Sequence, residues 1–219
     1  NGPHWSLFFE YIGNIFYGLL IRRMSTAMLT VWTIVIGAAF AVFGISDIVG
    51  YGNIGVGWTL DGMNFWGGLL RMLFPFSCGL LMSRVFKPIK IRGAFWLCTI
   101  LIVIFLSVPN LGSVNCIYEV MCVIIVFPIV VYLAASGQTT DDTSTSLCRF
   151  LGDISYPLYA VHYPTMYLFY HYIGFPETWR TPGETWPWIV GIALFNIVLA
   201  YAALKLYDEP IRKWLAKKL

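Results

Sequence analysis

The sequence predicts an all-α fold, a polytopic membrane helix bundle of about seven transmembrane helices with its N-terminus outside and its C-terminus inside. Three observations predict it. Of the 219 residues, 58% are hydrophobic and only 11% are charged, whereas ordinary soluble domains have about 25% charged residues. The apolar residues form seven long segments, and the basic residues gather in alternate connections. With a mean hydropathy of +0.73, this much apolar surface needs lipid as its solvent.

Seven segments are candidates to cross a hydrocarbon core, which takes about 20 predominantly apolar residues in a helix. The first segment is short and polar for a span, whereas the fourth and fifth are the most uniformly apolar. We find no internal repeat, so residues 1–219 are expected to form a single membrane domain. The segments cover residues 5–21, 27–45, 64–82, 93–109, 115–135, 153–173 and 186–206.

The basic residues predict how these segments are oriented, because Lys and Arg concentrate on the cytoplasmic side of membrane proteins. If residue 1 lies outside, Arg180 is in an outside loop and Arg71 is within a span. All the other basic residues of the 14 then lie inside, namely Arg22, Arg23, Arg84, Lys87, Lys90, Arg92, Arg149, Lys205, Arg212, Lys213, Lys217 and Lys218.

The connections and the C-terminus have features typical of a membrane interface. The predicted outside loops are a glycine-rich loop at 46–64, a short one between the fourth and fifth spans, and 174–188. Beyond the last span, "YDEPIRKWLAKKL" predicts an amphipathic helix on the anionic inner surface, with Asp208 or Glu209 as N-cap and Pro210 at the first helical position. Five tryptophans predict an interfacial aromatic belt, namely Trp58, Trp66, Trp179, Trp186 and Trp188.

The cysteines and the N-terminus predict little chemistry of their own. The five cysteines show neither a C-x-x-C pattern nor a Cys/His metal spacing, so we interpret them as small core or lipid-facing residues. We expect no bound metal, no resident cofactor and no nucleic-acid partner; the expected partner is the lipid bilayer. The chain begins with Asn1 rather than Met and shows no signal peptide, so we expect the natural chain to start earlier.

Polar residues inside the predicted spans are candidate site residues, because an ionisable group at a span centre costs about 2.5–3.5 kcal/mol on insertion scales. Glu10 and Asn14 are four residues apart, on one helix face. Arg71 stays charged at any ordinary pH and therefore needs an acidic partner, a group of carbonyls or an anionic ligand. Near span ends, Glu119 and His171 are expected to be interfacial.

The sixth span carries its polar residues on one stripe. Ser155, Tyr159 and His162 follow each other at i, i+4 and i+7, which places them on one helix face. This stripe is as typical of hydrogen bonds between helices as of a substrate site. Together these polar groups predict a cavity that suits a transferase, a transporter or a permease equally.

Three segments resemble the acyltransferase-3 family of bacterial membrane O-acyltransferases. "FLGDISYPLYAVHYP" followed by "YDEPIRKWL" is similar to the family's G-x-x-S-Y-x-x-Y-x-x-H segment and its closing D/E-x-P-x-R helix. "WSLFFE" resembles the W-S-L-x-x-E segment with Trp5, Ser6, Leu7 and Glu10, and "LLRMLFPFSCGLLM" resembles the family's arginine segment.

The resemblance implies transfer of an acyl group, usually acetyl, from a cytoplasmic thioester donor such as acetyl-CoA to a hydroxyl of a cell-envelope carbohydrate, in the inner membrane. A general-base histidine would take the hydroxyl proton, and positive groups would stabilise the oxyanion. The residues expected to line the substrate cavity are Trp5, Glu10, Asn14, Arg71, Ser155, Tyr159 and His162.

The sequence also departs from the family pattern. Family members have about ten spans and begin with an R-x(10)-H pair and an F-F-x-x-S-G-F segment, and neither is found in these 219 residues. The family's catalytic histidine is therefore not expected among them, and His162 corresponds to another family position. The alternatives are a permease for an anionic or acylated small molecule, or an inactive remnant of the acyltransferase.

Overall fold

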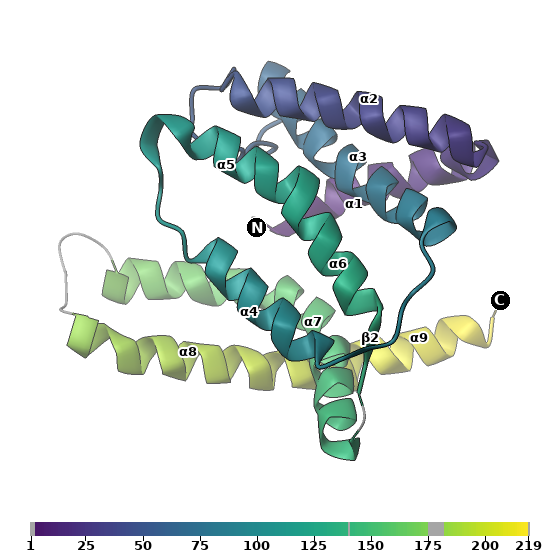
Figure 1. Ribbon diagram of the computed structural model, residues 1–219. Helices are drawn as coiled ribbons and strands as arrows, with labels where there is room; N and C mark the ends of the chain where they lie inside the picture. The colour runs from purple at the N-terminus through teal and green to yellow at the C-terminus, as the bar shows by residue number, and fades with distance from the viewer. Residues whose placement is uncertain (1–2, 140, 175–181, 219) are drawn as a thin grey trace. The chain divides into compact units, whose positions relative to one another are not determined.

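The fold is helical, as the sequence predicts. The computed structural model describes residues 3–139, 141–174 and 182–218, which form helices joined by loops and two short strands (Figure 1). The expectations for Trp179, Arg180 and Leu219 lie outside these residues. The elements are α1 (Pro3–Leu19), η1 (Ile21–Arg23), α2 (Thr26–Ile45), α3 (Gly62–Val85), β1 (Ile91–Arg92), α4 (Ala94–Leu106), η2 (Gly112–Val114), α5 (Asn115–Met121), η3 (Cys122–Val126), α6 (Phe127–Ala135), β2 (Gly137–Gln138), α7 (Asp142–Phe169), η4 (Tyr170–Gly174), α8 (Pro182–Ala203), η6 (Leu204–Asp208) and α9 (Glu209–Ala216).

Every predicted span coincides with helix in the structure, and within the described ranges four helices are long and apolar enough to cross a membrane. At most 28% of each apolar window is buried inside the protein, so most of its apolar surface needs lipid as a solvent. The chain is therefore a multi-pass membrane protein, while the orientation of its termini stays a prediction. The four helices are Thr26–Ile45, Gly62–Val85, Gly112–Ala135 and Gly183–Ala216, and a shorter apolar helix covers Ala94–Leu106.

The chain divides into two compact units, His4–Thr140 and Asp141–Leu219 with Asn1–Pro3. We call them the N-terminal unit and the C-terminal unit. The first contains nearly all of α1 and the elements from η1 to β2, and the second contains α7, α8 and α9 with the π-helical turns that follow α7 and α8. The expectation of a single membrane domain stays a prediction.

The N-terminal unit packs around aromatic residues of α2 and α3. The rings of Phe40 and Phe74 lie parallel with their centroids 6.1 Å apart, and with Val120 of α5 they form the buried cluster. Gly37 of α2 lets the Phe74 ring approach, since a Cβ there would lie 2.8 Å from a ring carbon. A hydrogen bond of 3.0 Å from the Trp32 indole to the buried Ser77 hydroxyl joins the same two helices.

One end of the N-terminal unit is tied together by the strand pair. β1 and β2 pair in parallel, with Ile91 opposite Gly137. The amide of Ile91 donates to the carbonyl of Ser136 at 3.0 Å, and the amide of Ile89 donates to its hydroxyl at 3.3 Å. The segment that follows α3, the start of α4 and the end of α6 therefore meet at this end, next to the basic segment 84–92.

In the C-terminal unit the last span runs on into α9 without a break. Asp208, the residue before α9, has a helical backbone conformation, and its side chain makes no capping hydrogen bond to α9. The reason is that η6 joins α8 and α9 into one helix. The sequence-based expectation of a capped new helix is therefore wrong. The D-x-P-x-R motif instead forms an ion pair between Asp208 and Arg212, and Lys205 pairs with Glu209 one turn earlier. Both are i, i+4 pairs, which support a helix.

The start of α7 has a side-chain cap. The carboxylate of Asp141 accepts a hydrogen bond of 2.7 Å from the amide of Ser144, the usual N-cap contact. This hydrogen bond lowers the pKa of Asp141 below its ordinary value. The capping contribution is therefore complete above the unfolded pKa near ~3.9, and it is lost as the pH falls through the lower folded pKa.

We expect acidification below about pH 4 to fray the first turn of α7. Faster amide hydrogen exchange at Ser144 and Thr145 would show it, after correction for the intrinsic pH dependence of exchange. Asp141→Asn is the control, because its amide oxygen still caps the helix but does not titrate. An identical pH response in both proteins would contradict the assignment.

Candidate functional site

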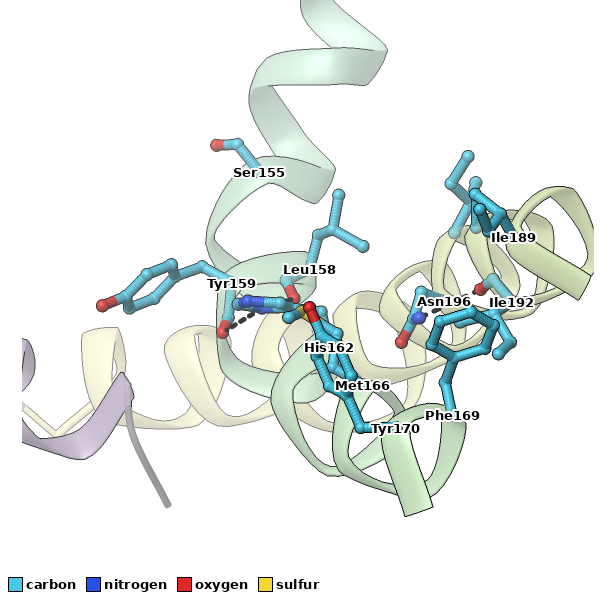
Figure 2. A pocket seen from close by; sticks show the side chains of 12 residues that line it. Ser155, Leu158, Tyr159, His162, Met166, Phe169, Tyr170, Ile189, Ile192 and Asn196 are labelled. Atoms are coloured by element: carbon cyan, nitrogen blue, oxygen red, sulfur yellow. Dashed lines mark hydrogen bonds between the residues drawn. The ribbon is translucent and has the colours of Figure 1, made fainter. Parts of the chain in front are cut away.

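A cavity of the C-terminal unit lies between α7 and α8. Its volume is about 680 Å³, within the range of about 300–1,000 Å³ typical of small-molecule sites. Its wall is mainly apolar, and its polar groups include the imidazole of His162 and the amide of Asn196 (Figure 2). The lining residues are Ser155, Leu158, Tyr159, His162, Met166, Phe169, Tyr170, Ile189, Ile192, Ala193, Asn196 and Ile197.

A bend in α7 places His162 in this cavity. Figure 2 shows the part of α7 that carries Ser155 turning near Leu158 and His162 into a second part that carries Met166 and Phe169. The helix contains Pro157 and Pro164. A proline lacks the amide proton and clashes with the carbonyl four residues earlier, so it kinks a helix. The two prolines thus give α7 a concave side.

The hydrogen bonds of His162 decide the role of each ring nitrogen. Nδ1 lies 3.1 Å from the carbonyl oxygen of Leu158 and 2.9 Å from that of Tyr159. Carbonyl oxygens only accept, so Nδ1 must carry the proton. In the neutral ring Nε2 is then an acceptor, and among the described residues it has no hydrogen-bond partner. This nitrogen can accept a hydrogen bond from a ligand in the cavity.

A polar pair, Thr165 and Asn196, joins α7 to α8 next to the backbone of His162. The hydroxyl of Thr165 lies 2.8 Å from Oδ1 of Asn196 and 2.6 Å from the carbonyl oxygen of His162. Nδ2 of Asn196 donates to the carbonyl of Ile192 at 2.9 Å, and the asparagine is 5% exposed. A buried amide with its hydrogen bonds made fixes the register of two helices, so this pair holds the α8 wall of the cavity against α7.

Another cavity lies in the N-terminal unit, where the glycine-rich loop 46–61 forms part of its wall. Its volume is about 330 Å³. It is more polar than the first and contains both an arginine and a carboxylate. The lining residues come from the loop, α3, the end of α4 and the helix that starts at α5: Asn53, Ile54, Gly55, Arg71, Phe105, Leu106, Val108, Asn115, Tyr118, Glu119, Cys122, Val123 and Phe127.

Arg71 and Glu119 both contact the backbone of this loop. Nη1 of Arg71 donates to the carbonyl of Val56 at 3.2 Å. The carboxylate of Glu119 accepts from the amide of Ile54 at 2.7 Å and from Nδ2 of Asn115 at 2.9 Å. Glu119 is thus a partly buried residue of the cavity wall, and its expected position at the membrane interface stays a prediction.

The structure brings three of the predicted site residues together. Ser155, Tyr159 and His162 line the same cavity, while their functional role stays a prediction. Arg71 lines the cavity of the other unit.

Three predicted residues lie on α1 and are not among those that line either cavity. Trp5 is half-buried and makes an edge contact with Phe8. Glu10 and Asn14 are exposed, and Asn14 donates from Nδ2 to the carbonyl of Glu10 at 3.0 Å. The functional role of these three residues stays a prediction.

Sequence reasoning did not single out Asn196 and Asn115, which line the cavities, or Thr165, which hydrogen-bonds to Asn196. Asn196 is the one amide within the apolar run "GIALFNIVLA", and that contrast could have marked it. Asn115 precedes Glu119 by one helical turn, but no spacing rule links these residues to their loop partners, which are 63 and 65 positions away. Thr165 gives no sequence signal, since hydroxyl residues commonly bond their own helix.

Comparison with known families agrees with this architecture. The model of the acyltransferase-3 family, described as an acyltransferase domain, matches residues 1–205. That range includes every lining residue of both cavities. No curated protein and no solved structure matches the chain. Since the family model covers nearly all of the sequence, the chain belongs to the acyltransferase-3 family.

Proposed function

We propose that this protein is an O-acyltransferase of the bacterial inner membrane. It transfers an acetyl group from a cytoplasmic thioester donor, acetyl-CoA, to a hydroxyl of a cell-envelope carbohydrate. The observation that carries the proposal is the family match over residues 1–205, which implies acyltransferase activity. The four apolar helices long enough to span a membrane support a reaction across the bilayer.

The cavity of the C-terminal unit suits the acyl-bearing arm of the donor. This arm is a narrow chain of apolar groups interrupted by amides, and the cavity has an apolar wall with few polar groups. Nε2 of His162 would accept a hydrogen bond from a donor amide. Ser155 lies on the same α7 wall and Asn196 on the facing α8 wall. We therefore assign His162 to holding the donor.

The chemistry requires one proton to move and two bonds to change. The acceptor hydroxyl gives up its proton to a base while its oxygen bonds to the thioester carbonyl carbon. The carbon–sulfur bond then breaks, and the leaving thiolate takes a proton. The family resemblance assigns the base to an R-x(10)-H histidine that these 219 residues do not contain, so no base is assigned to His162.

The basic residues support the direction of transfer. With the proposed orientation, the segment 84–92 and the C-terminal lysines face the cytoplasm, where the anionic donor is supplied. The glycine-rich loop 46–61 then faces the cell envelope. The N-terminus would lie outside and the C-terminus inside.

Acyl transfer in membranes tests the proposal directly. Membranes that contain the protein expressed from its natural gene are supplied with acetyl-CoA labelled in the acetyl group. We expect label in the envelope carbohydrate, and none with membranes that lack the protein. Uptake of a small anion that continues without any thioester would instead support a permease, and absence of both activities would support an inactive remnant.

A further inference from the structure

We infer that the cavity beneath the glycine-rich loop is the acceptor site and binds a neutral, hydroxyl-bearing sugar unit of the envelope carbohydrate. The inference rests on the proposed function, which it extends by separating acceptor from donor. It follows from the way the loop is held, from the chemistry of the wall, from the charge balance and from the position of the cavity along α3.

The loop is held in one conformation by side chains. Oδ1 of Asn64 accepts from the amides of Gly57 and Trp58 at 2.5 and 2.9 Å. Oδ2 of Asp47 accepts from the amide of Gly52 at 3.0 Å. Together with Glu119, these residues hold four loop amides. A loop fixed this way can form the roof of a binding site without being ordered by the ligand.

The wall combines the groups that recognise a sugar. Hydroxyls both donate and accept, so they need acceptors such as the Glu119 carboxylate and donors such as a guanidinium. Each oxygen of Glu119 has a second lone pair beyond its bond to the protein. The phenol of Tyr118 donates to the carbonyl of Phe105 at 2.7 Å, which leaves its oxygen able to accept. The rings of Phe105 and Phe127 provide apolar surface for the carbon face of a sugar.

Size and charge both favour a neutral acceptor over the donor. About 330 Å³ is at the lower end of the range for small-molecule sites, which suits one sugar unit. Arg71 and Glu119, the charged residues that line this cavity, balance each other. A CoA thioester carries several phosphate charges, and this wall offers it no net positive charge.

The position of the cavity along α3 agrees with that assignment. Arg71 is nine residues from Gly62, the first residue of α3, so it lies about 14 Å from the end that carries the loop. The end of α4 and the start of α5 are at the same end. The basic segment 84–92 follows the opposite end of α3. The acceptor cavity and the predicted cytoplasmic face are therefore at opposite ends of the N-terminal unit.

Glu119→Gln tests the site with little disturbance of the loop, because the amide oxygen of glutamine can still accept from Ile54. We expect the acceptor KM to rise about tenfold, which corresponds to losing one hydrogen bond to a charged group, with the KM for acetyl-CoA unchanged. Tyr118→Phe is expected to act in the same direction and more weakly. Tyr132→Phe is the matched control. It also removes a tyrosine hydroxyl, from α6, which continues the helix that starts at α5, but at the other end of the N-terminal unit.

Binding is measured separately from transfer, by saturation-transfer difference NMR on the protein in detergent with N-acetylglucosamine or glucose as probe. We expect a signal from the wild type and from Tyr132→Phe, a weakened signal from Glu119→Gln, and no competition by CoA. Competition by CoA would overturn the inference and make the cavity a donor site. Transfer with an unchanged acceptor KM in Glu119→Gln would overturn the inference and leave the proposed function standing. Sugar binding at this cavity without any acyl transfer would overturn the proposed function, and the cavity would then be a sugar-binding site but not an acceptor site.

Discussion

Gly68→Ala is expected to destabilise the protein and open the glycine-rich loop. A Cβ at this position would lie 2.7 Å from the Cα of Gly57 and 2.6 Å from a ring carbon of Phe9. The first contact is with backbone, and Gly57 has a φ of +102° that other residues rarely adopt. The loop must therefore move away from α3. Overpacking of this kind costs about 1–3 kcal/mol, and we expect the upper end.

The measurement is thermal unfolding in detergent, combined with limited proteolysis within residues 46–61. Gly79→Ala is the matched control on the same helix, because a Cβ there meets no heavy atom within 4 Å. Alanine favours helix over glycine by about 0.8–1.0 kcal/mol, so the control should be neutral or stabilising. If Gly68→Ala unfolded at the same temperature as the control, the close approach of loop and helix would be refuted.

Replacing His162 with alanine is expected to lower kcat/KM for the donor about 5- to 150-fold. The physical reason is that a donor amide would lose its acceptor against the apolar wall of the cavity, and an unsatisfied polar group costs about 1–3 kcal/mol. The loss should appear mainly as a higher KM for acetyl-CoA. A fall in kcat of about 10²- to 10⁴-fold with an altered pH profile would instead identify His162 as a general base.

His171→Ala provides the control for this substitution. His171 lies in η4, which continues the α7 helix of His162. It is exposed and is not among the residues that line the cavity. Its replacement should leave both kinetic constants near the wild-type values. Equal losses in the two variants would show that His162→Ala acts by destabilising the helix formed by α7 and η4, and not by changing the cavity.

Much of the fold was predictable because a membrane span is determined by the composition of its own segment. A run such as "GAFWLCTILIVIFLSVP" has few alternatives to a helix surrounded by lipid. The spacing of Ser155, Tyr159 and His162 determines that they share a helix face. The family was also visible in local motifs. The junction between α8 and α9 was mispredicted for a local reason. Pro210 and the acidic pair before it resemble a helix start, whereas in the structure η6 connects α8 directly to α9.

The pairing of residues far apart in the chain was not predictable. Glu119 looks like an interfacial carboxylate in sequence, and only the folded loop gives it Ile54 as a partner. Arg71 looks like a span residue with an unknown partner, and only packing places the Val56 carbonyl beside it. Such contacts depend on how three helices and a loop close on one another, which local propensity does not contain.

The sequence by itself determined that this is a helical membrane protein of the acyltransferase-3 family, because hydropathy and short motifs are local properties. The tertiary structure alone decided which polar residues share a cavity. It placed His162 opposite Asn196 in one unit and Arg71 with Glu119 under the glycine-rich loop in the other. The physical reason is that a cavity is formed by side chains from several elements, and their meeting follows from packing and not from spacing along the chain.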